Sequence, residues 1–227
     1  MRDSYQNFFN HFNINFQNII DFGVEIDTIY PEPERIESEW RNLIHCIESN
    51  QEVYIRGYGR DAHGTKMYQE LYKMLLGNEN IKKDPTNNSH PTRLLQKVTG
   101  YSKIIKKDNS EKERISNYQI THIFGQTKNP FLFTAPWNIV WKSKILDPFT
   151  GHESKGRNTD LYKTAFTNKV KRLYSKFIKE YNDLALKYFS SPQLNDAFET
   201  MHNRLDIDEK TFEKFKSDAT NELKIII

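Results

Sequence analysis

Apolar residues recur at helical spacing along much of this 227-residue chain, and this periodicity constrains its fold more than any other feature. The longest such stretch, from Asp160 to Phe189, predicts a long C-terminal helix. Shorter helices are predicted at Ser4–Ile20, Glu34–Ser49, His63–Leu76, Thr92–Val98, Pro192–Leu205 and Asp208–Ile225. Short β-prone runs lie at Val53–Ile55, Tyr118–Phe124 and Phe131–Thr134, and residues 77–91 have the composition of a loop. We therefore expect a mostly helical α+β fold in which helices surround a small β-hairpin core.

Composition narrows the class of protein. No stretch approaches the roughly 18 consecutive apolar residues that a membrane span requires, and the first residues lack the pattern of a secretory signal. Cys46 is the single cysteine, which excludes an intramolecular disulfide framework and a cysteine-rich zinc site. We expect a cytoplasmic protein that does not interact with membranes.

Charge is distributed unevenly along the chain, although the net charge is +3. Residues 1–55 carry 3 Lys/Arg against 10 Asp/Glu, whereas residues 56–107 carry 11 against 4 and residues 142–187 carry 11 against 5. A polyanion would bind the second and third blocks rather than the first. A lysine-rich stretch can equally be a solvated face, and for the third block taken alone the two interpretations are equally supported.

The most informative segment is residues 118–155, where a histidine ends a predicted strand at His122. Gly125 and the Asn129-Pro130 pair then turn the chain. Asn138 follows at what we predict to be the start of a short helix, and His152 lies beyond it. This order of His, Asn and His resembles the HNH, or ββα-metal, nuclease family, and the match covers about a sixth of the chain.

A broader likeness is to bacterial type II restriction endonucleases of this nuclease type, including rare cutters of A/T-rich palindromes. It is carried by the stretches RGYGRDAHGT, DPTNN and the run from TKNP to DPFTGH. The resemblance implies a hydrolase that cleaves double-stranded DNA at a specific palindromic site. It also implies a homodimer, because a two-fold symmetric site is cut by a two-fold symmetric protein. The expected regions are residues 1–116 for helices and DNA recognition, 117–157 for a ββα-metal-like catalytic core, and 158–227 for C-terminal helices, packed as one unit.

The resemblance assigns roles to the motif residues. His122 would be the general base that activates water, since an imidazole is partly neutral near pH 7. Asn138 would fix the loop or lie near the metal, and His152 would bind the metal, Mg²⁺ with Mn²⁺ as a substitute. Two departures bear on the ligands: Thr121 stands where many family members have Asp, and Pro148 and Gly151 interrupt any helix before His152. Metal ligation would then pass to Asn138, Asp147 or Glu153.

Other functions remain open. Glu153-Ser154-Lys155, with Asp147 upstream, has the spelling of a PD-(D/E)xK nuclease site but lies between glycines that indicate a loop. Gln126-Thr127-Lys128 is a weaker variant of the same pattern. A non-catalytic DNA-binding module and a ribonuclease or toxin are the remaining alternatives.

Several side chains suit contacts with DNA. Arg56 and Arg60 lie on a glycine-rich turn and can bind phosphate or guanine, and Asn87 and Asn88 can pair with the edge of adenine. Each of these can also be ordinary turn chemistry. Further expected contacts are Lys66, Arg93, Lys97, Lys103 and Lys128. The predicted long helix offers Lys169, Lys171, Arg172, Lys176 and Lys179 as a possible phosphate-binding face.

Overall fold

The computed structural model describes residues 2–104, 112–151 and 153–227, and it confirms a mostly helical α+β fold. The helices in the described ranges are α1 (Ser4–His11), α2 (Phe16–Asp21), η1 (Phe22–Asp27), α3 (Pro33–Glu48), η2 (Arg60–Ala62), α4 (Thr65–Leu76), α5 (Ser89–Thr99), η4 (Asp147–Thr150), α6 (Arg157–Leu173), α7 (Ser175–Tyr188), α8 (Ser191–Arg204) and α9 (Glu209–Glu222). None of these helices has the length and apolar character needed to cross a membrane.

Six short strands form three two-stranded sheets within the described residues. Strands β1 (Val53–Ile55) and β2 (Ile81–Lys83) pair in parallel, as do β3 (Tyr101–Ser102) and β4 (Glu113–Arg114). Strands β5 (Tyr118–His122) and β6 (Ile139–Ser143) pair antiparallel, with Thr121 opposite Val140 and His122 opposite Ile139. Because β2 lies within residues 77–91, the prediction of a continuous loop there was wrong.

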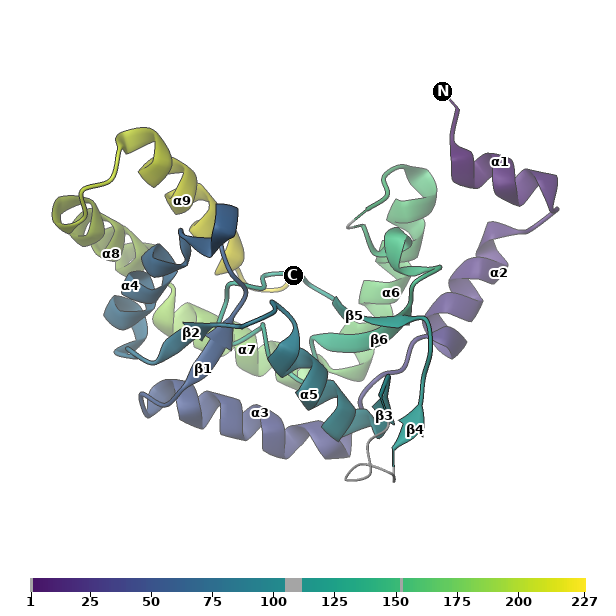
Figure 1. The fold of residues 1–227 in the computed structure, drawn as a ribbon, viewed down its shortest axis with the longest axis horizontal. Helices are drawn as coiled ribbons and strands as arrows, with labels where there is room; N and C mark the ends of the chain where they lie inside the picture. Colours follow the sequence, from purple (N-terminus) through teal and green to yellow (C-terminus); the bar gives the residue numbers. More distant parts are fainter. Residues whose placement is uncertain (1, 105–111, 152) are drawn as a thin grey trace.

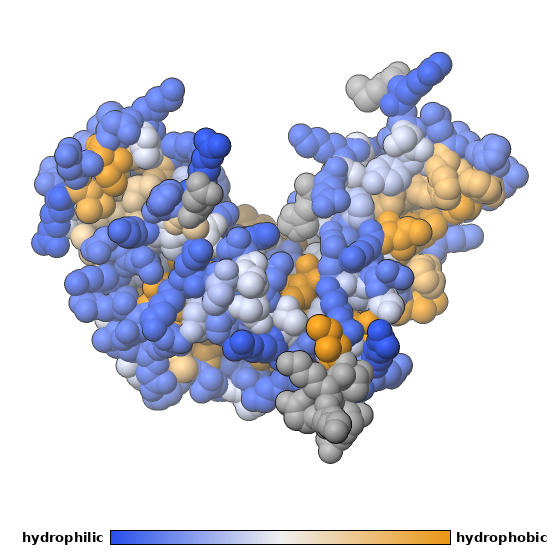
Figure 2. Space-filling view, in the orientation of Figure 1, coloured by the Kyte–Doolittle hydropathy of each residue, from blue (hydrophilic) through white to orange (hydrophobic). Residues whose placement is uncertain are grey.

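The molecule has the shape of a U (Figure 1). Helices α4, α8 and α9 form one arm, and α1, α2 and α6 form the other. Helix α5 and the sheets lie between the arms, with α3 and α7 along the base. Figure 2 shows that side chains do not fill the space between the arms, so the surface is deeply hollowed there.

The β5–β6 hairpin corrects two predictions. Phe131–Thr134 is a buried turn and not a strand, because the backbone N–H groups of Leu132 and Phe133 both donate to the carbonyl of Asn129, at 3.0 and 2.9 Å. The second strand begins later, at Ile139, so Asn138 precedes a strand and does not open a helix. The order of a hairpin followed by a helix is still present, since α6 comes after β6.

Most predicted helices are present with small shifts at their ends. Helix α5 begins earlier than predicted and ends at Gly100, which has the left-handed conformation that favours glycine, with φ 75°. The predicted helix at Asp160–Phe189 is interrupted at Tyr174, where α6 ends and α7 begins. The predicted helix at Ser4–Ile20 is likewise two helices, α1 and α2.

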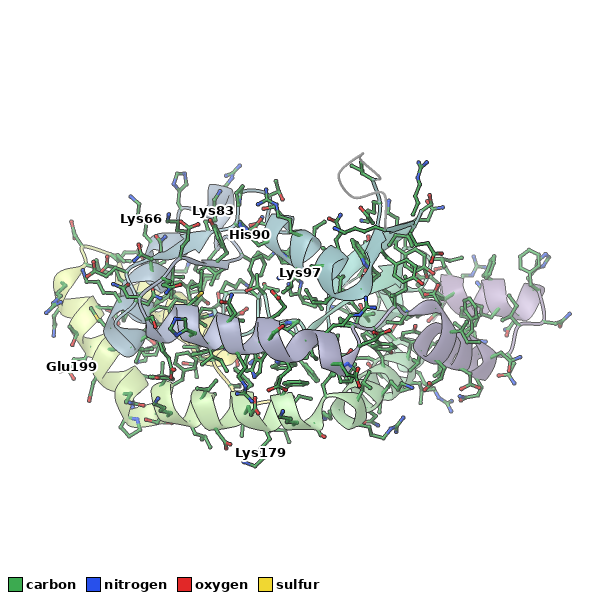
Figure 3. All side chains as sticks on the ribbon, turned by 90° about the horizontal axis from the view of Figure 1, so that it is seen from below. Lys66, Lys83, His90, Lys97, Lys179 and Glu199 are labelled. Carbon is green, nitrogen blue, oxygen red and sulfur yellow. The ribbon has the colours of Figure 1, made fainter. Side chains whose placement is uncertain are left out.

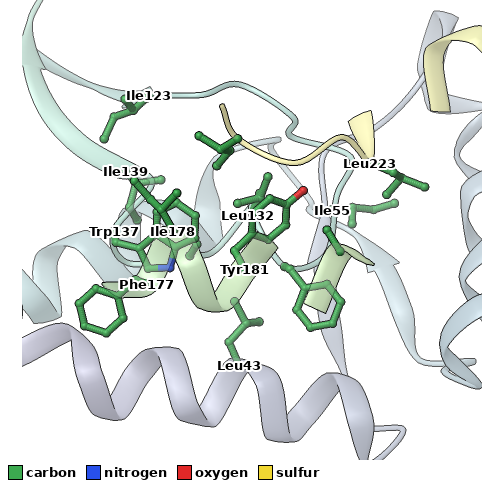
Figure 4. Packing of buried hydrophobic residues seen from close by; sticks show 14 of the residues in the cluster. Leu43, Ile55, Ile123, Leu132, Trp137, Ile139, Phe177, Ile178, Tyr181 and Leu223 are labelled. Carbon is green, nitrogen blue, oxygen red and sulfur yellow. The ribbon is translucent and has the colours of Figure 1, made fainter. Parts of the chain in front are cut away.

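Helices α3 and α7 run side by side along the base, as the view from below shows (Figure 3). The indole N–H of Trp40 in α3 donates to the Glu180 carboxylate in α7 at 2.8 Å, and Arg41 binds the same carboxylate at 2.6 Å. One hydrophobic cluster continues from these helices through the hairpin and includes residues of all three predicted regions. Figure 4 shows its centre, where Trp137 and Tyr181 lie between the hairpin and α7.

Candidate active site

A polar pocket of ≈ 330 Å³ lies where the end of β1, the start of α5, β5 and η4 meet. Four consecutive residues of β5 contribute to its wall, so the pocket follows the edge of β5 that does not pair with β6. Its lining consists of Arg56, Asn88, Thr92, Lys103, Gln119, Ile120, Thr121, His122, Thr127 and Asp147. The structure thus brings together five residues that the sequence singled out from separate segments, namely Arg56, Asn88, Lys103, His122 and Asp147.

His122 is held at the end of β5 with its ring in a defined orientation. Its Nε2 lies 3.0 Å from the carbonyl oxygen of Phe133, and its ring stacks on the Phe133 ring at 5.4 Å with an interplanar angle of 8°. A carbonyl oxygen can only accept a hydrogen bond, so Nε2 carries the hydrogen. In the neutral ring the basic nitrogen is therefore Nδ1. The residue is only 5% exposed, yet it lines the pocket.

Asn138 fastens the loop that joins β5 to β6. Its Oδ1 accepts from the backbone N–H of Phe124 at 3.0 Å, and its Nδ2 donates to the carbonyls of Leu132 at 3.0 Å and Gly125 at 3.5 Å. The side chain is fully buried and is not part of the pocket wall. These contacts are those of a loop-fixing residue, and full burial away from the pocket wall separates the side chain from any metal bound there.

Asp147 presents a carboxylate to the pocket that His122 also lines. Its oxygens accept from the hydroxyl of Thr121 and, at 2.5 Å, from the Nε2 of Gln119, and the residue is 4% exposed. The Thr121 hydroxyl thus ties β5 to the Asp147 carboxylate. Carboxylate oxygen is a ligand that Mg²⁺ prefers, and Mg²⁺ commonly takes one or two carboxylates together with substrate phosphate and water. Asp147 therefore fits a divalent ion.

Of the other predicted ligands, His152 lies outside the described residues, whereas Glu153 is exposed and does not line the pocket. Ser154 donates to the carbonyl of Pro148 at 2.6 Å, in a segment without strand structure, so the acid-x-Lys triplet at 153–155 lies in a loop. In the described part of the chain, no three His, Cys, Asp or Glu side chains gather as a metal-binding group.

Arg56 reaches the pocket from the turn that follows β1. The backbone N–H of Arg56 donates to the carbonyl of Thr127 at 2.9 Å, and that of Gly57 donates to the Oδ1 of Asn87 at 2.9 Å. Glycine is needed at position 57, because a Cβ there would lie 2.8 Å from the Cβ of Ala62. The packing against Ala62 fixes the Arg56 turn against η2, and the hydrogen bond to Asn87 joins it to the segment that precedes α5.

Lys103 supplies a second cation at the pocket wall. Its Nζ lies 5.2 Å from the centre of the Trp141 ring. Partial burial lowers the pKa of Lys103, and the nearby charge of Lys144 lowers it further. The two neighbouring lysines make this part of the surface positively charged. Such surroundings favour an anionic ligand.

The acidic N-terminal block pairs with several lysines of the third charge block. Lys169 pairs with Glu25 at 2.5 Å, Lys176 with Glu37 at 2.7 Å, and Lys187 with Glu48 at 3.2 Å. In addition, Lys179 pairs with its neighbour on α7, Asp183. These pairs explain how segments far apart in sequence balance their charges, and they argue against α7 as a phosphate-binding face.

The second charge block contains both paired and unpaired cations. Lys97 pairs with Glu39 at 2.6 Å, and Lys128, from the following segment, pairs with Glu222 at 2.8 Å. Within the described ranges no ion pair involves Arg56, Arg60, Lys66, Lys83, Arg93 or Lys103. Figure 3 shows Lys66 and Lys83 along one edge of the molecule, Lys97 nearer the middle of the view, and Lys179 on the opposite edge. Three of the predicted DNA contacts in this block, Arg60, Lys66 and Arg93, do not line the pocket.

Sequence reasoning missed Gln119, Thr92 and Thr127 as pocket residues. One signal for Gln119 was available: it is two residues from Thr121 on β5, so both side chains point to the same face. Both contact Asp147.

Comparison with known proteins identifies a family. The family model described as "Uncharacterised protein PM1201" matches residues 31–227, which include every pocket residue and leave out α1 and α2. The chain is 43% identical over 188 residues to the uncharacterized protein PM1201 of Pasteurella multocida (strain Pm70), covering 82% of this chain and 81% of that protein. No solved structure matches. The chain therefore belongs to the PM1201 family.

Proposed function

We propose that this protein is a metal-dependent endonuclease of the type II restriction class, which hydrolyses double-stranded DNA at a specific palindromic site. One observation carries the proposal: a single pocket contains an oriented imidazole, a carboxylate and two cations, namely His122, Asp147, Arg56 and Lys103. Hydrolysis of a phosphodiester needs these groups, because water must lose a proton while negative charge builds on the phosphate.

In the proposed reaction, Nδ1 of His122 takes a proton from the attacking water. The water oxygen bonds to phosphorus, and the bond to the 3′ oxygen breaks, leaving a 5′ phosphate; the departing 3′ oxygen takes a proton from a solvent water molecule to become the 3′ hydroxyl. The hydrogen bond from Nε2 to the Phe133 carbonyl keeps the ring in one orientation, and Arg56 and Lys103 offset the phosphate charge. A bound Mg²⁺, or Mn²⁺ in its place, would be held by Asp147 and would further neutralise the phosphate and the leaving oxygen.

The homodimer is part of the same proposal. One His122 site hydrolyses one strand, so cleavage of both strands at a palindrome calls for two copies of the chain related by a two-fold axis.

Incubation of the purified protein with supercoiled plasmid and Mg²⁺ tests the proposal. Discrete fragments are expected. A smear would indicate a nonspecific nuclease, cleavage of RNA alone would indicate a ribonuclease, and tight DNA binding without cleavage would favour a non-catalytic binding module. Thorough chelation with EDTA should stop cleavage, and persistent activity would exclude the metal-dependent mechanism.

The variant His122→Ala tests the assigned base. We expect cleavage to fall by a factor of roughly 10² to 10⁴ while DNA binding is retained, because the imidazole acts on water rather than on affinity. His45→Ala, which removes an exposed histidine on α3, is the matched control and should cut normally. Cleavage by His122→Ala at the normal rate would remove His122 from the mechanism.

A further inference from the structure

Two adjacent asparagines precede α5, and the structure gives them different roles. The side chain of Asn87 accepts the backbone N–H of Gly57 at 2.9 Å, which ties this segment to the turn carrying Arg56. Asn87 also has φ 65°, a left-handed conformation that asparagine tolerates better than most residues. Both properties belong to a structural residue, so Asn87 positions the segment.

Asn88 has an anchored backbone but an unanchored side chain. Its carbonyl accepts from the backbone N–H of Thr92 at 3.0 Å and from the Thr92 hydroxyl at 2.6 Å. It occupies the N-cap position of α5, yet its side chain forms no capping hydrogen bond. Its Oδ1 is buried and has no hydrogen-bond partner within the described residues.

A buried acceptor without a partner destabilises a protein, so such a group calls for an explanation. Asn88 lines the same pocket as His122, Asp147 and Arg56. Turning the amide into the pocket would allow a bound molecule to donate a hydrogen bond to Oδ1. The position of Asn88 is therefore that of a ligand-binding residue.

The chemistry of the amide selects the ligand. Phosphate oxygens only accept hydrogen bonds, and in the major groove guanine and thymine offer Oδ1 no donor. Cytosine offers a single donor, whereas adenine presents the N6 amino donor beside the N7 acceptor, which matches the amide oxygen and nitrogen of Asn88 together. Resting on the proposed nuclease function, we propose that Asn88 reads an adenine in the major groove, adjacent to the phosphodiester that His122 acts on.

The experiment uses His122→Ala protein, which binds DNA without cutting it, and a random-sequence duplex library. Bound duplexes are separated by gel shift and sequenced, in parallel for this protein and for versions that also carry Asn88→Ala, Asn88→Asp or Thr86→Ala. Thr86 is exposed in the same turn and serves as the matched control. Thermal unfolding of each protein establishes that it is folded.

We expect the parent and the Thr86→Ala protein to select the same sequence, with adenine at one position. Asn88→Ala should lose roughly 5-fold to 150-fold of the preference for adenine at that position alone, which corresponds to one bidentate contact. Asn88→Asp should shift the preference there toward cytosine, because a carboxylate accepts from the cytosine N4 amino group and cannot donate to adenine N7.

The outcomes separate this inference from the nuclease proposal. A selected sequence that neither Asn88 variant alters would overturn the role of Asn88 and leave the nuclease proposal intact. Failure of the parent protein to bind any duplex would overturn both. If Asn88→Ala does not fold, the isosteric Asn88→Asp decides the question by its preferred base.

Discussion

Lys142 on β6 is fully buried, and its environment predicts an unusual dependence of stability on pH. Its Nζ donates to the carbonyl of Gly23 at 2.5 Å and to the hydroxyl of Thr28 at 2.7 Å, and it pairs with Asp27 at 3.3 Å. Burial lowers the pKa of Lys142 from 10.5 to about 8, although the Asp27 charge works in the opposite direction. These contacts also attach η1 to the hairpin that carries the candidate site.

The sign follows from proton linkage. Between pH 8 and 10.5 the unfolded chain keeps the Lys142 proton while the folded chain releases it, so the unfolded state binds more protons and stability rises with pH. Between pH 7 and pH 9, loss of the Lys142 proton in the folded state raises the free energy of unfolding by about 1.4 kcal/mol. Burial also raises the pKa of several tyrosines, including Tyr162 and Tyr174, whose ionisation in the unfolded chain opposes the rise by about 0.4 kcal/mol at pH 9.

We therefore expect the free energy of unfolding to increase by about 1 kcal/mol from pH 7 to pH 9, and to fall steeply above pH 10 as the tyrosines take over. Urea unfolding, followed by tryptophan fluorescence at intervals of half a pH unit, measures this directly. In Lys142→Met the rise should be absent, although the variant is less stable overall because Asp27 loses its partner. A stability that is flat or falling between pH 7 and 9 in the wild type would refute the reasoning, as would a rise that persists in Lys142→Met.

Other predictions follow from the pairing of charges and amides. Arg60→Ala should make the slope of log affinity for DNA against log salt concentration shallower by about 0.9. Lys176→Ala should leave this slope unchanged, because Lys176 is paired with Glu37. Equal slopes for the two variants in an anisotropy titration would contradict this. Asn138→Ala should lower the free energy of unfolding by about 3 kcal/mol, since it leaves buried backbone groups unpaired; a urea midpoint close to that of the wild type would be inconsistent with the role in the loop. Burial disfavours ionisation of Asp84, but hydrogen bonds from the start of α5 hold its pKa at about 2. The ionised Asp84 therefore contributes about 2 kcal/mol to the free energy of unfolding above pH 4, and this contribution is lost as the pH falls toward 2. Asp84→Asn should make the free energy of unfolding depend less on pH in this range, as urea unfolding would measure.

The features predicted well from the sequence were those set by neighbouring residues. Apolar spacing placed α3, α4, α8 and α9 close to their observed bounds, and Gly100 marked the end of α5. His122 was predicted at the end of a strand and lies there. Local periodicity and turn chemistry are sufficient for such features, because they depend on residues within a few positions of one another.

The second strand of the hairpin could not be located in this way. The apolar run Phe131–Thr134 has the composition of a strand, but the Asn129 side chain accepts the backbone N–H of Phe131 at 2.9 Å and stabilises a turn. That turn is buried against α7, where the hydroxyl of Tyr181 accepts from the amide of Asn129 at 2.9 Å. A hydrogen-bond partner 52 residues away in the chain therefore overrides the local preference of Phe131–Thr134 for a strand.

The sequence by itself determined which residue types are available for chemistry, and that the charge is divided into blocks. Only the tertiary structure decided which of these residues meet. The Asp147 carboxylate contacts β5 through Thr121. Acidic residues of the N-terminal block pair with lysines of α6 and α7, whereas Arg56 has no ion pair among the described residues. The physical reason is that hydrogen bonds and ion pairs act over a few ångströms, and the distances between side chains from separate segments are set by the packing of the whole core.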